Sequence, residues 1–354
     1  MLYHLLYPLA GEFGGFNVFR YITFRTAAAT LTALFLSFLV GPRLITALAR
    51  LRVGQPIREI GPDHQAKAGT PTMGGLLILL SLLVAVLLWS ELDNRQVWIV
   101  LALTAGYGVL GFADDYRKVT QRRSDGVPGR VKLFWQFLLA FGVAFAIYLQ
   151  PGFSAELSVP FFKDVTPHLG ALYVPFAALV IVSFSNAVNL TDGLAIGPVM
   201  ITAGTLLVLA YAAGNKTIAE YLAIAYVPGA GQLAIFCGAL VGGGLGFLWF
   251  NTYPAQLFMG DVGSLALGGA LGTIAVLVRQ EILLGVVGGV FMLEMLSVMI
   301  QVASFKLTGK RVFLMAPIHH HYEKQGWAEQ KIVVRFWIVS IILALVALSS
   351  LKLR

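Results

Sequence analysis

Two adjacent carboxylates, Asp114 and Asp115, end a long apolar run of this sequence, and basic residues follow at once. An aspartate at the centre of a bilayer-spanning helix costs about 2.5–3.5 kcal/mol, so we expect the pair at a helix end, at the water boundary. Adjacent carboxylates also repel each other unless a cation lies close to both. The pair therefore indicates either an ordinary polar helix terminus or a site for a divalent metal and phosphate at the membrane surface.

Other polar groups collect in segments that also separate apolar runs. They are Lys67, Thr72, Asn189, Asp192, Asn251, Asp261, His319, His320 and His321. Hard oxygen ligands from aspartate favour magnesium, which proteins usually hold with one or two carboxylates plus substrate phosphates. Three contiguous histidines on a short segment cannot all reach one zinc ion, so they are better suited to phosphate contact or proton transfer.

Each of these signals also has a structural interpretation. Asp192-Gly193 is a common turn sequence. Asp261, followed by glycine and serine, suits the cap of the next helix as well as it suits a metal. Lys67 is also explained as a solvated charge, and Glu294 as one partner of a helix–helix hydrogen bond. An acid inside a predicted span is nevertheless a functional candidate by default.

The composition is that of an integral membrane protein. Of 354 residues, 58% are hydrophobic and only 12% are charged, whereas a soluble domain carries about 25% charged residues. The single cysteine, Cys237, excludes a disulfide framework and a cysteine-based zinc site. The net charge of +8 is then explained by basic cytoplasmic loops, and we expect no nucleic-acid partner.

Apolar runs long enough to span a bilayer predict an all-α protein with about ten transmembrane helices in one domain, residues 1–354. The expected spans are 22–41, 73–90, 97–113, 133–150, 171–188, 196–213, 231–250, 263–278, 282–304 and 336–351. The glycine pairs Gly242/Gly246 and Gly268/Gly272 have the spacing that allows helices to approach closely.

The distribution of basic residues predicts the orientation of these spans. Of the 25 lysines and arginines, about two thirds fall in the loops that also carry the polar clusters. The positive-inside rule places those loops in the cytoplasm, and an even number of spans places both termini in the periplasm. The polar groups thus converge on one cytoplasmic cleft. Such a site predicts an enzyme that joins a water-soluble phosphate compound to a lipid phosphate, with magnesium and basic residues neutralising a diphosphate.

Five motifs together resemble those of the bacterial phospho-N-acetylmuramoyl-pentapeptide transferases, within the polyprenyl-phosphate sugar-1-phosphate transferase superfamily. They are KAGTPTMGG (67–75), GFADDYRKV (111–119), NAVNLTDGL (186–194), FMGDVGS (258–264) and APIHHHYEKQGW (316–327). The resemblance covers nearly the whole chain. It implies transfer from UDP-N-acetylmuramoyl-pentapeptide to undecaprenyl phosphate in the cell inner membrane, giving lipid I and UMP. It also implies a requirement for Mg²⁺, a homodimer, and a groove for the polyprenyl chain near the ninth span.

The resemblance assigns roles to individual residues. Asp114 and Asp115 correspond to an essential pair, in which Asp114 is expected to deprotonate the lipid phosphate. The expected metal ligands are Asp261 and Asp115, and His319, His320 and His321 correspond to a motif required for activity. The expected substrate contacts are Lys67, Thr72, Lys118, Lys132, Asn189, Asp192, Gly193, Leu194, Asn251 and Phe258, with Phe258 stacking on uracil.

One segment departs from the family's pattern. Residues 189–196 read NLTDGLAI, where the family has a second Asp-Gly-Leu that begins with a uracil-contacting aspartate; Ala195 stands in that place. Either uridine affinity is lowered, or Asp192 replaces the missing group. Whether transfer occurs in one step or through a covalent intermediate is left open by the sequence.

Two other functions compete with this prediction. The first is a sister transferase that uses UDP-N-acetylglucosamine, against which the GTPTMGG and PIHHHYEKQGW stretches argue. The second is a secondary transporter with an acidic substrate site. Transporters place such residues near the bilayer midplane, whereas these acids, apart from Glu294, lie at the predicted cytoplasmic ends of the spans.

Overall fold

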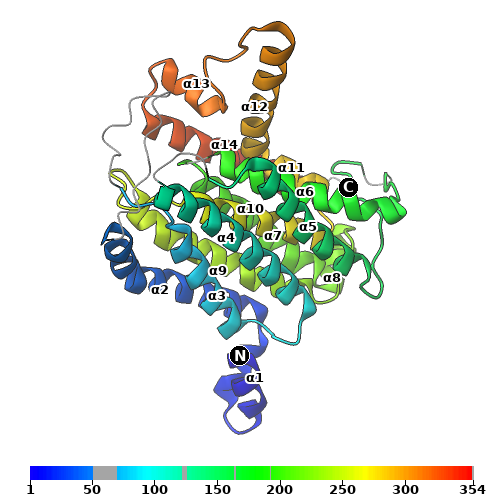
Figure 1. Ribbon diagram of the computed structural model, residues 1–354. Helices are drawn as coiled ribbons and strands as arrows, with labels where there is room; N and C mark the ends of the chain where they lie inside the picture. The colour runs from blue at the N-terminus through cyan, green and yellow to red at the C-terminus, as the bar shows by residue number, and fades with distance from the viewer. Residues whose placement is uncertain (51–69, 122–125, 163–164, 192, 353–354) are drawn as a thin grey trace.

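The computed structural model describes residues 1–50, 70–121, 126–162, 165–191 and 193–352, and within these residues it contains helices and no strand (Figure 1). The elements are α1 (Leu2–Leu6), η1 (Tyr7–Gly11), η2 (Gly14–Arg20), α2 (Ile22–Arg50), α3 (Gly75–Trp89), α4 (Arg95–Gln121), α5 (Gly129–Tyr148), η4 (Gly170–Leu172), α6 (Tyr173–Leu190), α7 (Ile196–Ala213), α8 (Lys216–Leu222), η5 (Ala230–Gln232), α9 (Leu233–Asn251), α10 (Gly260–Leu277), α11 (Glu281–Val287), α12 (Gly289–Thr308), α13 (Ile318–Lys324) and α14 (Glu329–Ser350). The predicted all-α fold is confirmed.

Nine helices in the described part of the chain are long and apolar enough to cross a membrane, so the protein is a multi-pass membrane protein. The remaining predicted span, 73–90, corresponds to α3, which has only 15 residues. At about 1.5 Å per residue, α3 is about 22 Å long, shorter than a hydrocarbon core of about 30 Å. The helix begins late because Met73 has a left-handed backbone, with φ of 70°, and so cannot belong to it.

The predicted span 282–304 is wrong in its bounds, because the chain forms two helices there. α11 ends at Val287 and α12 begins at Gly289. Gly288 separates them, and a Cβ at this position would lie 2.3 Å from the Phe184 ring of α6. Phe184 therefore packs directly on the joint between the two helices. Glycine also lowers helix propensity by about 1 kcal/mol, which favours a break at this point.

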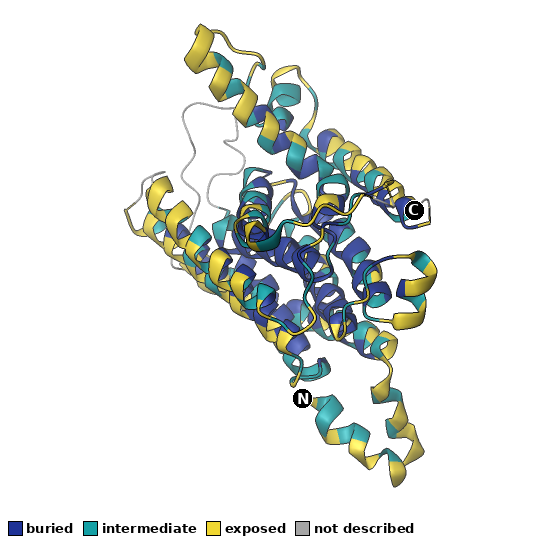
Figure 2. Ribbon diagram, turned by 90° about the vertical axis from the view of Figure 1, so that its right-hand side faces the viewer, coloured by how far each residue is buried: buried dark blue, intermediate teal, exposed yellow. Residues whose placement is uncertain are grey.

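The centre of the bundle is α10, which contacts α4 and α6 along its length and is almost entirely buried (Figure 2). Glycines make this packing possible, as predicted. A Cβ on Gly268 would lie 2.7 Å from Ser185 Cα of α6, and one on Gly242 of α9 would lie 2.0 Å from Thr30 O of α2. Only glycine allows two backbones to approach this closely.

The outer helices α2, α5, α12 and α14 are largely exposed (Figure 2), and many of their exposed residues are apolar. α12 extends away from the bundle in Figure 1 and packs against α6, α11, α13 and α14. Its outward residues include Leu293, Met299 and Phe305, each more than half exposed. Such a surface is stable when it faces lipid.

Candidate active site

The Asp114–Asp115 pair lies inside α4 rather than at its end, so the predicted position at a helix terminus is wrong. α4 continues past the pair to Gln121. The two side chains are almost fully buried, with 1% and 3% of their surface exposed. Burial of two adjacent carboxylates costs free energy unless nearby groups compensate for their charge, and the structure supplies those groups.

A third carboxylate completes a cluster with this pair. Asp114, Asp115 and Asp261 each place one carboxylate oxygen within 4.8 Å of the others. Asp261 lies in the first turn of α10, and no side-chain hydrogen bond caps the start of this helix. Of the two interpretations of Asp261, helix cap and metal ligand, the structure thus rejects the first. We call these three residues the carboxylate cluster.

Two lysines face the carboxylate cluster. Lys132 Nζ donates to Asp261 Oδ2 at 2.7 Å and lies 3.1 Å from Asp114 Oδ1. Lys118 Nζ lies 2.6 Å from Asp114 Oδ2 and 3.3 Å from Asp261 Oδ2. Both lysines were predicted to contact substrate, and the structure shows their ammonium groups beside the predicted metal ligands. Two positive charges offset most of the charge of three carboxylates.

Backbone groups fix the orientation of the aspartates. The Val262 N–H donates to Asp115 Oδ2 at 3.1 Å, and the Val127 N–H donates to Asp114 Oδ1 at 2.9 Å. Gly260, with φ of 70°, lies directly against Asp115: a Cβ there would be 2.4 Å from Asp115 Oδ2. The start of α10 thus fits the carboxylate only because residue 260 is glycine.

The segment before α3 pairs with the segment before α10. The Phe258 N–H donates to Pro71 O at 2.8 Å, and the Gly74 N–H donates to Phe258 O at 2.7 Å. Thr72 is buried between them, and its hydroxyl oxygen would be 2.9 Å from a Cβ on Gly260. The predicted substrate contacts Thr72 and Phe258 are therefore held beside the carboxylate cluster.

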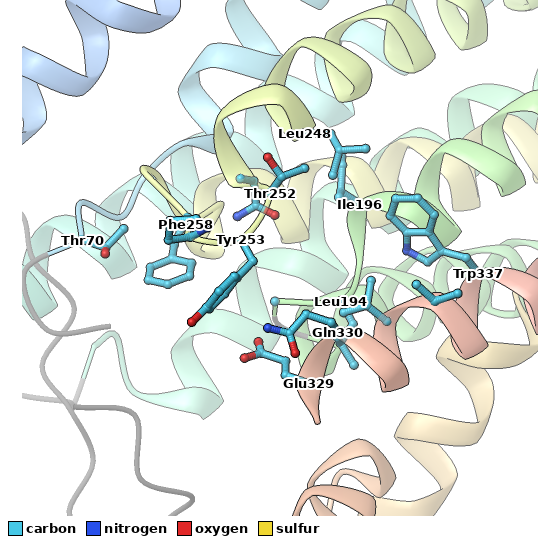
Figure 3. Close-up of a pocket in the computed structure, with 16 residues that line it drawn as sticks. Thr70, Leu194, Ile196, Leu248, Thr252, Tyr253, Phe258, Glu329, Gln330 and Trp337 are labelled. Carbon is cyan, nitrogen blue, oxygen red and sulfur yellow. The ribbon is translucent and has the colours of Figure 1, made fainter. Parts of the chain in front are cut away.

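A cavity of about 430 Å³ lies next to this paired segment (Figure 3). Four of the predicted substrate contacts line it together, namely Gly193, Leu194, Asn251 and Phe258. The sequence analysis missed the other lining residues, which include Thr70, Tyr253, Glu329, Gln330 and Trp337. Glu329 and Trp337 belong to α14, which no motif linked to this site. The volume is in the usual range for a small-molecule site.

Comparison with known proteins now identifies the family. The family model for Glycosyl transferase family 4 matches residues 97–279, and the phospho-N-acetylmuramoyl-pentapeptide-transferase signature 1 matches residues 67–79. A phospho-N-acetylmuramoyl-pentapeptide-transferase of Geobacter sp. (strain M21) is 61% identical over 358 residues, which covers 100% of both chains. Proteins of the same name from Citrifermentans bemidjiense and Pelobacter propionicus are 60% and 57% identical, again over 100% of each chain.

The chain belongs to the phospho-N-acetylmuramoyl-pentapeptide-transferase family. The resemblance drawn from the five motifs is thereby confirmed, and the transporter hypothesis is rejected. Membership in this transferase family does not assign roles to individual residues, so these roles stay predictions.

The three histidines of this family member lie on α13, and no hydrogen bond or ion pair in the described residues joins them to the carboxylate cluster. His319 Nδ1 lies 3.1 Å from Glu294 Oε2. His320 Nδ1 lies 2.7 Å from Glu323 Oε2. The Leu314 N–H donates to His321 Nδ1 at 3.1 Å. Their required role in activity stays a prediction. For Glu294 the structure shows the hydrogen-bonded alternative, with α13 as partner.

Three further predicted contacts complete the account of this transferase site. Asn189 lies at the end of α6, and its amide donates to Ser264 Oγ of α10 at 2.8 Å. Lys67 and Asp192 lie outside the described residues. Ala195, which stands where the family has an aspartate, is 1% exposed and immediately precedes α7. It therefore presents no polar group to the cavity.

Proposed function

We propose that this protein transfers phospho-N-acetylmuramoyl-pentapeptide from its UDP conjugate to undecaprenyl phosphate, giving lipid I and UMP. The observation that carries the proposal is full-length identity of 57–61% to proteins named for this activity. The carboxylate cluster and the adjacent cavity support it, because a sugar nucleotide needs a site for its diphosphate and another for its nucleoside. The apolar outer helices place the reaction in the cell inner membrane, where the lipid substrate is present.

In the one-step form of the proposed reaction, an oxygen of undecaprenyl phosphate attacks the phosphorus that carries the sugar. A new P–O bond forms to the lipid phosphate, the bond between the two phosphates of the UDP group breaks, and UMP leaves with the electron pair. We expect Lys118 and Lys132 to bind the phosphate oxygens, because their ammonium groups lie beside the carboxylates that are proposed to hold the metal. Asp114 accepts the proton of the lipid phosphate when that group arrives protonated.

The carboxylate cluster fits a magnesium ion. Three carboxylates provide hard oxygen donors, the kind of ligand that magnesium prefers, and one oxygen of each lies within 4.8 Å of the others. Asp261 and Asp115 are the proposed ligands. When bound, the ion would neutralise part of the diphosphate charge.

The magnesium proposal is tested with the Asp261→Asn variant. The amide removes one charged ligand, so the magnesium concentration that gives half-maximal activity should rise by at least about 10-fold, the lower end of the loss in affinity known for residues that only support metal ligands. An unchanged magnesium titration would remove Asp261 from the metal site.

The activity itself is tested by UMP release from the purified protein in nanodiscs. We expect UMP from UDP-N-acetylmuramoyl-pentapeptide only when undecaprenyl phosphate and magnesium are both present, and none after chelation. UDP-N-acetylglucosamine serves as the second substrate, because release from it instead would support the sister transferase. No release from either substrate by folded protein rejects the proposal. The proposed homodimer is checked in the same nanodiscs by measuring the mass of the particle.

A further inference from the structure

The histidines of α13 differ in the partners of their ring nitrogens, although they follow one another in the sequence. The helix that carries them packs against α12 and α14 (Figure 1). The Nδ1 atom of His320 lies 2.7 Å from Glu323 Oε2, about one turn later in the same helix. The Nδ1 atom of His321 instead accepts a hydrogen bond from the Leu314 N–H at 3.1 Å. Two neighbouring rings thus meet partners of opposite kinds at the same atom.

These partners determine where each ring carries its hydrogen. A neutral imidazole has a hydrogen on one nitrogen and a lone pair on the other. Because a carboxylate only accepts hydrogen bonds, the hydrogen of His320 lies on Nδ1 and the lone pair on Nε2. Because a backbone N–H only donates, Nδ1 of His321 has the lone pair, and its hydrogen lies on Nε2. The Gln325 amide, 3.0 Å from this Nε2, accepts that hydrogen when its oxygen faces the ring.

The surroundings of Glu323 favour this arrangement. Only 11% of its side chain and 24% of the His320 side chain are exposed, so little water competes for Nδ1. A carboxylate on one ring nitrogen fixes the orientation of the imidazole and makes the opposite nitrogen more basic. His319 shares the arrangement through Glu294, but its ring is almost fully buried and therefore less accessible than that of His320.

We propose that Glu323 is a positioning residue for the transfer reaction. It holds His320 with the hydrogen on Nδ1, so that Nε2 can accept a hydrogen bond from a hydroxyl or P–OH group of the substrates. His321 has the opposite form and cannot replace it. The inference rests on the proposed function in taking His320 as a substrate contact, whereas the position of the hydrogen is independent of that function.

The position of the hydrogen is tested by ¹⁵N NMR of the full-length protein in nanodiscs, labelled on histidine, at pH 8. A ring nitrogen with a lone pair resonates far downfield of one that carries hydrogen, and the signals that disappear in His320→Asn assign the ring. The chain supplies a reference for each form. His321 represents hydrogen on Nε2, and His4, whose Nε2 accepts from the Leu92 N–H at 3.0 Å, represents hydrogen on Nδ1.

We expect the signals of His320 to match those of His4. Signals that match His321, or that show hydrogen on both nitrogens, would overturn the inference, because Nε2 would then have no lone pair.

The positioning role is tested with Glu323→Met, which removes the acceptor and keeps a side chain of similar length. We expect kcat/KM for UMP release to fall by about 100-fold, the lower end of what a positioned acid or base contributes. The control is Glu220→Met, an exposed glutamate of α8 whose Oε1 lies 4.0 Å from Lys216 Nζ, and it should leave kcat/KM unchanged. An unchanged kcat/KM in Glu323→Met would reject the role.

Glu323→Gln separates this role from a purely structural one. The amide presents either its oxygen to Nδ1, which keeps the hydrogen there, or its NH₂ group, which moves the hydrogen to Nε2. The value of kcat/KM should stay within about tenfold of wild type in the first case and fall as in Glu323→Met in the second. A rate that does not follow the position of the hydrogen would show that Glu323 only stabilises α13.

These outcomes leave the proposed function untouched. That function fails only if the wild-type protein releases no UMP, and the NMR signals of His320 are read without any turnover.

Discussion

Gly260 supports the geometry of the carboxylate cluster, and the substitution Gly260→Ala measures how much depends on it. The added Cβ would lie 2.4 Å from Asp115 Oδ2, and ordinary contact begins near 3.4 Å, so the carboxylate must move by about 1 Å. That movement breaks its hydrogen bond from the Val262 N–H, at a cost of about 1–3 kcal/mol for a buried group. The left-handed backbone at residue 260 adds about 1–2 kcal/mol.

The matched control is Gly309→Ala. Gly309 has the same φ of 70°, but a Cβ there meets nothing within 4 Å. Both variants therefore carry the backbone cost, and only Gly260→Ala displaces Asp115. We expect Gly260→Ala to be less stable than the control by about 1–3 kcal/mol in mixed-micelle unfolding. Its rate of UMP release should be about 100-fold lower, as for a misplacement of 1 Å. Rates that agree within about threefold would show that the position of Asp115 does not limit catalysis.

Two further predictions concern the groups around this site. Lys132→Met removes an ammonium that contacts two carboxylates, so turnover in the UMP-release assay should fall by about 100-fold. The control is Lys216→Met, which removes an exposed lysine whose Nζ lies 4.0 Å from Glu220 Oε1 and should leave turnover unchanged. Equal rates for the two variants would contradict the role of Lys132. Glu294→Ala leaves buried His319 without its partner and should lower the free energy of unfolding by about 1–3 kcal/mol. If the variant unfolds with the same free energy as the wild-type protein, this hydrogen bond contributes little to stability.

The sequence predicted the class of fold well because apolar runs report directly on membrane spans. It failed where tertiary packing decides the ends of helices. The acidic pair was expected at the end of a span, but two lysines and the first turn of α10 compensate for its charge, so α4 continues to Gln121. Similarly, the joint at Gly288 depends on the Phe184 ring of another helix, and no pattern within residues 282–304 indicates that contact.

The candidate site also contains residues that the sequence indicated and residues that only the tertiary packing brings there. Residues in recognisable motifs, such as Asp261, Asn251 and Phe258, lie in the carboxylate cluster or around the cavity, and their roles stay predictions. Glu329 and Trp337 were missed, because they reach the cavity only through the way α14 packs beside α7. In the sequence, Glu329 looks like any polar residue at the start of a helix. Only the folded structure shows that it lines the cavity.

The exposed helix α12 has a practical consequence for these experiments. Glu294, in its second turn, contacts His319 of α13, and most of the residues of α12 face outward. The tilt of such a helix follows the thickness of the hydrocarbon around it. A detergent micelle, which has no fixed thickness, can therefore displace α13 while the buried bundle stays intact. Rates for variants are comparable only when all are measured in one lipid of defined acyl length.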